Sequence, residues 1–447
     1  MSRREEAKKK PIDGRFSSVQ SPAPRMVTAH SSRALRSGRW LTEGLLTLAL
    51  TTTATAAAAQ PVTATVLDRT AVVEQARRRS WGVRVATARS GEARALREGA
   101  ALPARENPSL QLRSGPRWTS DRGPVADLSL ALSWPVDLSG SAGARTRHAD
   151  AAADSAEAEV RNSVRVAIGE ALDLYARVLG AAATVGLAEA RTTLDDELVR
   201  AAGVRRAAGA TGDGDVAMAD AVRAEAAARM HRARAEREAL RAELLAALGL
   251  DAQGATEIAG DLAPPTEPAS LETLLARAER RSDVLSSEAL VRLARTDVEV
   301  QRRAGLPVPR LMVQGIRENE IFVQAGVEVP LPVYQRNQTA RAVSVAVAAT
   351  REAQQEALRA RARCEVVAAW RRSDGAAQAF AVINGARGAV EESERLALRA
   401  YELGRAELVG VLVVRRAAMD ARAAQVDALV TWVRARVALD VAAGTEP

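Results

Sequence analysis

Two short stretches of the chain alternate between apolar residues and polar or small residues. The first runs from Leu128 to Val136 and the second from Ile321 to Val329. A period of two predicts a β-strand that has one apolar face and one mostly polar face. The apolar face is expected to contain Leu128, Leu130, Leu132 and Trp134 in the first strand and Ile321, Val323, Val327 and Val329 in the second.

Each strand ends at prolines (Pro135 in the first, Pro330 and Pro332 in the second), and a long proline-free region follows. A spacing of 195 residues separates Pro135 from Pro330, and the same spacing separates Gly209 from Gly404 and Gly249 from Gly444. One spacing kept across different local sequences indicates a duplicated unit of roughly 190 residues. We place the first repeat at 60–262, with strands at about 108–136 and a helical hairpin at 139–249. The second repeat is placed at 263–447, with strands at about 309–330 and a hairpin at 338–441.

The positions of proline predict the helices. None of the 17 prolines lies within 136–263 or 333–446, and proline costs about 3 kcal/mol inside a helix. Glycines interrupt each window once, so we expect helices at 139–208, 216–249, 338–403 and 408–441, with shorter helices at 67–99 and 271–304. In each repeat the helix before the strands and the helix after the turn have a summed length close to that of the long helix. This predicts that these two shorter helices stack end to end along the long one. Apolar residues such as Leu172, Tyr175, Val178 and Leu179 recur at a coiled-coil-like spacing.

The strands have the length that crosses a bilayer when tilted, which is about 9–11 residues. Four strands from one chain form an open sheet, and lipid cannot satisfy the hydrogen bonds of its edges. Closure therefore requires several copies that each contribute four strands to one barrel. We expect the eight apolar residues named above to face the lipid around that barrel. The alternative is a soluble sheet packed on helices, in a coiled-coil scaffold or a periplasmic adaptor protein.

The net charge of the chain is concentrated at its N-terminus, and only there does it add to the prediction. The net charge of +8 comes mainly from residues 1–59, which hold all three lysines, whereas arginines and carboxylates nearly balance in the rest of the chain. A basic region, an apolar run at Leu41–Leu50 and small residues up to Ala59 predict a signal or targeting segment at 1–59. The start could be Met1 or Met26. No basic and aromatic patch indicates nucleic-acid binding.

The two junctions LSWPVDLSGSAGAR and VEVPLPVYQRNQTAR, the turn YELGRAELVGVL and the duplicated order helix, strand, strand, long helix, turn, helix together resemble the TolC-like outer-membrane efflux proteins. The second junction is most similar to the branch that serves heavy-metal pumps. The resemblance covers about 60–447 and implies a mainly α-helical homotrimer with a twelve-stranded membrane β-barrel and a periplasmic helical tunnel. It further implies the outer membrane of a Gram-negative bacterium as the location. The implied partners are a periplasmic adaptor protein and an inner-membrane pump of the RND type. The implied role is passive conduction of metal ions or small toxic compounds to the exterior.

The resemblance also suggests a gate at the two helical turns, which contain Gly209 and Gly404. In the family an aspartate of the first turn bonds to a tyrosine of the second turn, and here Asp215 and Tyr401 occupy those positions. Arg405 is a further candidate, and the alternative for Asp215 is an N-cap of a helix that starts at Val216. The aspartate rings of the tunnel entrance in the best-known members fall here on Gly410 and Val413. Asp213 and Glu407 could replace them, although charges solvated at a turn are the simpler interpretation.

No pattern indicates an enzyme, a metal site or a cofactor site. Asp213 and Asp215 lack the later ligands of a calcium loop, and His148 and His231 have no zinc-binding partners at suitable spacing. Cys364 is the only cysteine, and we expect it to be a buried packing residue.

Overall fold

The computed structural model describes residues 65–119, 123–209, 212–317 and 320–445. These ranges belong to one compact unit, Pro61–Pro447. The predicted targeting segment at 1–59 lies outside the described residues. Helices make up most of the unit, as the sequence predicts.

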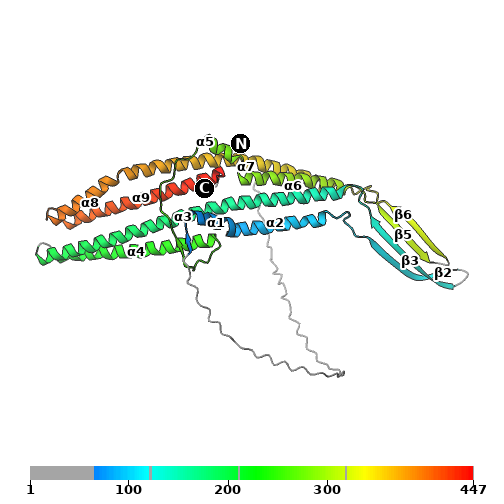
Figure 1. Ribbon diagram of the computed structural model, residues 1–447, viewed down its shortest axis with the longest axis horizontal. Helices are drawn as coiled ribbons and strands as arrows, with labels where there is room; N and C mark the ends of the chain where they lie inside the picture. The colour runs from blue at the N-terminus through cyan, green and yellow to red at the C-terminus, as the bar shows by residue number, and fades with distance from the viewer. Residues whose placement is uncertain (1–64, 120–122, 210–211, 318–319, 446–447) are drawn as a thin grey trace, which may run out of the picture. The chain divides into compact units, whose positions relative to one another are not determined.

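The elements of the unit occur in two similar series (Figure 1). The first series contains β1 (Thr65–Leu67), α1 (Arg69–Arg79), α2 (Trp81–Ala100), β2 (Ser109–Thr119), β3 (Gly123–Pro135), α3 (Ser141–Ala207) and α4 (Asp213–Ala247). The second contains β4 (Thr256–Ile258), α5 (Leu271–Ala278), α6 (Ser282–Ala304), β5 (Arg310–Arg317), β6 (Ile321–Glu328), α7 (Gln338–Gly385), α8 (Arg387–Glu402) and α9 (Leu408–Ala443).

Three predicted helices are each interrupted. The helix expected at 67–99 is two helices that meet at Ser80, and the helix expected at 271–304 is two helices that meet near Arg281. The Ser80 side chain accepts a hydrogen bond from the Val83 N–H (3.4 Å) and so begins a new helix. The helix expected at 338–403 breaks at Ala386, beside Gly385, where glycine lowers helix propensity. The short strands β1 and β4, which pair in parallel, were not predicted.

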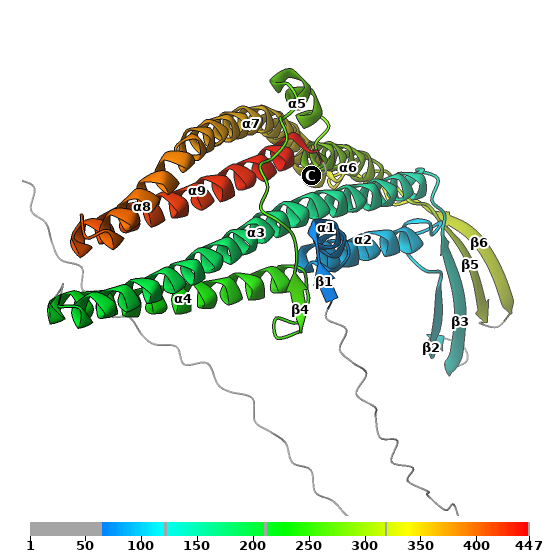
Figure 2. The same ribbon diagram turned by 60° about the vertical axis from the view of Figure 1, so that its left-hand side comes forward.

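The short helices stack along the long ones, as the lengths predict. Helix α3 packs against α1 and α2 and against α4, whereas α7 packs against α5 and α6 and against α9. Contacts of α3 with α6 and α9 join the two repeats. Figures 1 and 2 show the four longer strands beyond one end of α3 and α7 and the helical turns at the other end.

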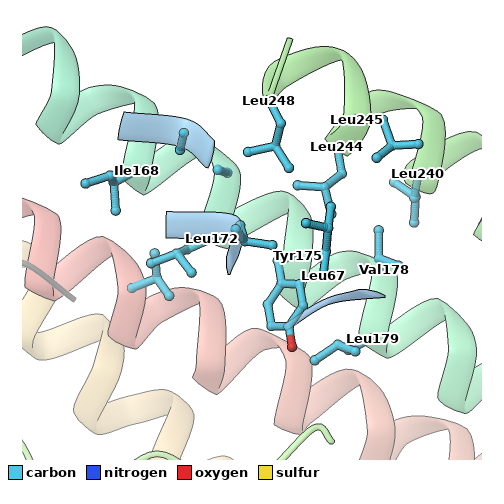
Figure 3. Packing of buried hydrophobic residues seen from close by; sticks show 14 residues of the cluster. Leu67, Ile168, Leu172, Tyr175, Val178, Leu179, Leu240, Leu244, Leu245 and Leu248 are labelled. Carbon is cyan, nitrogen blue, oxygen red and sulfur yellow. The ribbon is translucent and has the colours of Figure 1, made fainter. Parts of the chain in front are cut away.

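The largest core cluster lies where α1, α3 and α4 meet (Figure 3). Leu172, Leu244, Leu245 and Leu248 are each at most 2% exposed, and burying such a side chain contributes about 1.5–3 kcal/mol. The second repeat has a corresponding cluster around Leu439, Ala443 and Val366. Helix α3 supplies Ile168, Leu172 and Val178 to the first cluster. Among the described residues it is the one helix that is long and apolar enough to cross a membrane by length and composition.

The two series have the same backbone conformation at the ends of α4 and α9, the return helices that follow the turns. Gly249 (φ 66°) follows α4 and Gly444 (φ 72°) follows α9, both in the left-handed region that favours glycine. A Cβ on Gly249 would lie 2.6 Å from the Arg79 carbonyl oxygen, and one on Gly444 would lie 3.1 Å from Arg281 Cγ. Each glycine therefore allows its return helix to end directly against the corner between two short helices.

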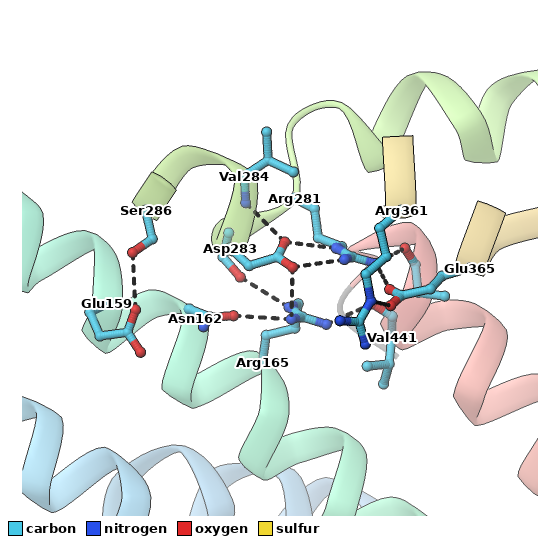
Figure 4. Close-up of polar contacts among 12 residues, drawn as sticks. Glu159, Asn162, Arg165, Arg281, Asp283, Val284, Ser286, Arg361, Glu365 and Val441 are labelled. Carbon is cyan, nitrogen blue, oxygen red and sulfur yellow. Dashed lines mark hydrogen bonds and ion pairs between the residues drawn. The ribbon is translucent and has the colours of Figure 1, made fainter. Parts of the chain in front are cut away.

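A buried ionic cluster links the repeats at the second corner, which lies between α5 and α6 (Figure 4). Arg281 is 3% exposed, binds both carboxylate oxygens of Asp283 at 2.7 Å, and contacts Glu365 on α7 at 2.8 Å. Arg165 of α3 lies 3.7 Å from Asp283 and donates to the Val441 carbonyl of α9. Burial by itself raises the pKa of Asp283, but hydrogen bonds from Arg281 and the charges of Arg281 and Arg165 outweigh it and lower that pKa.

Candidate membrane-facing sheet and helical tip

The four longer strands form one antiparallel sheet in the order β2-β3-β5-β6. Leu132 is paired with Leu110 on one side and Val313 on the other, and Leu311 is paired with Val327. Paired residues of antiparallel strands share a face, so one face is apolar across all four strands. The residues predicted to face lipid all lie exposed, from 42% (Leu132) to 75% (Ile321): Leu128, Leu130, Leu132, Trp134, Ile321, Val323, Val327 and Val329.

The opposite face of the sheet is more polar. It carries Gln111, Ser129, Ser133 and the cross-strand pair Gln314 and Gln324. Strands β2 and β6 lie at the two edges, and each is paired on one side only within the part of the chain that the structure describes. An apolar face this large on a sheet with two open edges is unsuited to water.

The junctions between sheet and helices are built around the predicted prolines. Pro135 is the last residue of β3, and Pro330 and Pro332 follow β6. These three prolines line a cavity of about 420 Å³ between the strand ends and the helices. Beside it, the Asp137 carboxylate accepts hydrogen bonds from the N–H groups of Ser139 and Ala142 and fastens the start of α3. Burial opposes ionisation, yet these bonds and those from two serine hydroxyls hold the pKa of Asp137 far below its usual range.

The two turns at the other end of the helices contain the predicted glycines. Gly209 (φ 70°) and Gly404 (φ 71°) are both left-handed. After α8, the Gly404 N–H donates to the Tyr401 carbonyl and the Arg405 N–H donates to the Ala400 carbonyl. This is the standard closure of a helix end by a left-handed glycine. The Arg405 backbone thus completes α8, and its side chain is exposed.

Tyr401 contacts Arg205, a residue that sequence reasoning did not single out. The Tyr401 side chain is 1% exposed and packs with Leu198 of α3 and with Leu408 and Val411 of α9. The Arg205 guanidinium lies 4.5 Å from the centre of the Tyr401 ring and donates to the Tyr401 carbonyl at 3.4 Å. The Tyr401 hydroxyl is buried without a hydrogen-bond partner in the described part of the chain. No bond to Asp215 is formed in this structure.

The remaining predicted tip residues sit at helix starts. Asp213 is the first residue of α4 and pairs with Arg206 at 2.6 Å, whereas Glu407 is the N-cap of α9 without a side-chain capping bond. Gly212 is the N-cap of α4, so the interpretation of Asp215 as an N-cap is wrong. Asp215 lies in the first turn of α4, where the helix dipole favours a carboxylate.

A second charged contact between the repeats lies further from the turns. Arg415 of α9 is 7% exposed and donates to the Leu194 carbonyl of α3 at 3.0 Å. Asp195 is 4% exposed and pairs with Arg191 at 3.4 Å. Burial raises the pKa of Asp195, and the two arginines only partly oppose this. The sequence holds a signal for this contact. Arg415 follows Leu408 and Val411 at the three- and four-residue spacing of one helix face, and both of those residues are buried.

The part of the chain that the structure describes contains no group of His, Cys, Asp or Glu side chains arranged to hold a metal ion. Cys364 is exposed, so the expectation that it is buried is wrong. It lies on α7, on a face that no element among the described residues covers.

The chain thus has an exposed apolar sheet at one end of two long helical hairpins. Solved structures share this fold. A membrane protein from Pseudomonas aeruginosa matches with a TM-score of 0.70 at 21% identity, over 84% of this chain and 90% of that chain. The outer membrane protein VceC from Vibrio cholerae matches with a TM-score of 0.69 at 19% identity, over 84% and 96%. The open state of the Neisseria gonorrhoeae MtrE outer membrane channel matches with a TM-score of 0.68 at 18% identity, over 84% and 89%.

Comparison with protein-family models gives no match, and comparison with curated protein sequences gives none either. The mainly helical fold of the single chain, one part of what the resemblance to TolC-like proteins implies, is confirmed by the solved structures.

Proposed function

We propose that this protein is the outer-membrane channel of a tripartite efflux system in a Gram-negative bacterium. Three copies each contribute β2, β3, β5 and β6 to a twelve-stranded barrel, and the helices form a tunnel in the periplasm. A periplasmic adaptor and an inner-membrane pump of the RND type deliver metal ions or small toxic compounds to this tunnel. The channel conducts them passively and performs no bond-making chemistry.

The observation that carries this proposal is the sheet. Its apolar face is exposed on all four strands, and its two edges are open. In lipid every backbone N–H and C=O needs a partner, which only a closed sheet provides. The shared fold with outer-membrane channels supports the same arrangement.

Two matched substitutions test the orientation of the sheet. Leu130→Arg puts a charge on the apolar face, which costs about 2–4 kcal/mol at the middle of a bilayer. Ser129→Arg puts the same charge on the neighbouring residue, which faces the polar side. We expect Leu130→Arg to abolish the heat-sensitive trimer in outer-membrane fractions and Ser129→Arg to retain it. Release of the wild-type protein by osmotic shock, without detergent, would contradict the proposal and favour a soluble scaffold.

We further propose that Asp215 and Tyr401 hold the closed state of the periplasmic end. A bond to Asp215 would give the buried Tyr401 hydroxyl the partner that it lacks among the described residues, and Asp215 lies in the first turn of α4 near the same end of the hairpins. Asp215→Ala and Tyr401→Ala should each raise single-channel conductance in planar bilayers. Asp251→Ala, beyond the opposite end of α4, is the control, and unchanged conductance in both tip variants argues against this lock.

A further inference from the structure

Equivalent faces of the two long helices differ in how they are covered. On α3, Gly169 and Gly180 lie directly beneath α9. A Cβ on Gly169 would come within 2.7 Å of Val441 Cγ2, and one on Gly180 within 2.4 Å of Val430 Cγ2. At these two positions α3 of the first hairpin therefore lies very close to α9, the return helix of the second.

The same face of α7 is uncovered. A shift of 195 residues carries Gly169 to Cys364 and Gly180 to Gly375. Cys364 is exposed, and Gly375 is exposed with no atom within 4 Å of a Cβ built on it. The face that α9 covers in the first repeat is therefore covered by no described element in the second.

The helix that corresponds to α9 is α4. Its residues equivalent to Val441 and Val430 are exposed as well. The same shift carries Val441 back to Ala246 and Val430 back to Ala235, and both alanines are exposed. Helices α4 and α9 begin 195 residues apart, at Asp213 and Leu408. The shift holds inside the core as well, because Leu244 and Leu439 occupy equivalent places in the two core clusters.

We propose that α4 of a second copy of this chain covers the exposed face of α7, in the register that places Ala246 opposite Cys364 and Ala235 opposite Gly375. This interface rests on the ring of copies proposed above and specifies how its helices meet. The two surfaces differ, so the contact is heterologous and each copy uses α7 toward one neighbour and α4 toward the other. Such contacts close into a ring when the rotation allows it.

The side chains at this seam, the proposed interface between α4 of one copy and α7 of another, differ from those at the contact of α9 with α3 inside the chain. Arg434 and Asp173 form an ion pair across α9 and α3 at 2.6 Å. Their equivalents across the proposed seam are Ala239 and Ala368. Alanine, glycine and cysteine allow helices to pack at the short end of the usual interaxial range of about 8–10 Å. The subunit seam is therefore packed by small residues, with no ion pair at this position.

The natural cysteine permits a direct test. In the full chain, Ala246→Cys gives a thiol expected to face Cys364 of a neighbouring copy. Oxidation with copper phenanthroline should then give disulfide-linked oligomers that survive heat on a non-reducing gel. Ala228→Cys is the register control, because it lies 18 residues away, which is five turns and about 27 Å along the same helix face. We expect about tenfold more linked product from Ala246→Cys, since a disulfide needs Cα atoms within about 7 Å.

A second pair checks the register independently. In a Cys364→Ser background, Gly375→Cys combined with Ala235→Cys should link, whereas Gly375→Cys combined with Ala246→Cys should not. Equal linking by all pairs, or preferential linking by Ala228→Cys, overturns the proposed seam. A heat-sensitive trimer that forms in the outer membrane but does not link also overturns it while leaving the channel function intact. A protein that forms no membrane trimer contradicts the channel function itself.

Discussion

The two repeats follow the same backbone path at their corners but stabilise it with different side chains. Ser80 and Arg281 both precede the second short helix, with φ and ψ of −56° and 143° for Ser80 and −60° and 143° for Arg281. Both residues are buried. Ser80 only caps α2, whereas Arg281 binds Asp283, Glu365 and the Ala442 carbonyl. The two corners share one backbone geometry, and in the second corner the Arg281 side chain also connects α6, α7 and α9.

The long helices show a second difference. Helix α3 is continuous over 67 residues, but its counterpart breaks at Ala386 into α7 and α8. Helix α3 is supported by α4 and α9 toward the tip, whereas α8 packs mainly on α9. With fewer neighbours, the helix propensity of Gly385 and Gly388 has more influence on the local structure. The second hairpin therefore has a natural bending point that the first lacks.

Arg281→Ala is expected to have the largest effect on stability. It leaves Asp283 and Glu365 without their buried partner, and removing one member of a buried ion pair costs about 3–5 kcal/mol. Ser80→Ala at the equivalent corner removes one capping bond and should cost about 0.5–2 kcal/mol. Urea titration of the detergent-solubilised protein, followed by circular dichroism at 222 nm, measures both.

Arg361→Ala is the control for charge at this corner. Arg361 also pairs with Glu365 but its side chain is 76% exposed, so its loss should cost about 0–1 kcal/mol. Equal losses for Arg281→Ala and Ser80→Ala would mean that the two corners do not differ in the way argued above.

The same corner predicts a pH dependence. The pKa of Asp283 is lower in the folded protein than its ordinary value of 3.8. The unfolded chain therefore takes up this proton at a higher pH than the folded chain does. The resulting stabilisation is complete above about pH 4 and is lost as pH falls through the folded pKa. Asp283→Asn should flatten the acid limb of the urea midpoint plotted against pH, whereas an unchanged limb would show that other carboxylates govern it.

The packing of α3 on α9 predicts a smaller effect. Gly180→Ala places a Cβ against Val430, and such overpacking typically costs about 1–3 kcal/mol. Gly186→Ala lies on the same helix with nothing within 4 Å, so it should stabilise α3 by up to about 1 kcal/mol through helix propensity. Opposite signs in urea titration support the close contact. Stabilisation by both substitutions would show that α9 does not approach Gly180.

The sequence predicts the regular features of this fold but not its long-range contacts. The strand face follows from the period of two in residues such as Leu130 and Val323, and the helical regions follow from the positions of proline. The corner at Arg281 was missed because its partners come from α6, α7 and α9, which no local pattern connects. Cys364 was expected to be buried because it lies within a helix; which side of α7 is covered depends on other helices.

The contact between Arg205 and Tyr401 at the helical turns is expected to have the smallest effect on stability. It tests most directly how the two hairpins differ. Arg205 of the first repeat lies over Tyr401 of the second, whereas the position equivalent to Arg205 is Ala400. A partly exposed cation–π contact contributes about 0.5–1 kcal/mol. Arg205→Ala should therefore speed amide exchange in residues 398–404 by up to about fivefold, since 1.4 kcal/mol corresponds to a factor of ten. Arg206→Ala is the neighbouring control, because it removes only an exposed ion pair with Asp213 inside the first hairpin. Faster exchange in both variants would indicate general fraying of α3, whereas an effect confined to Arg205→Ala shows that this side chain restrains the second hairpin.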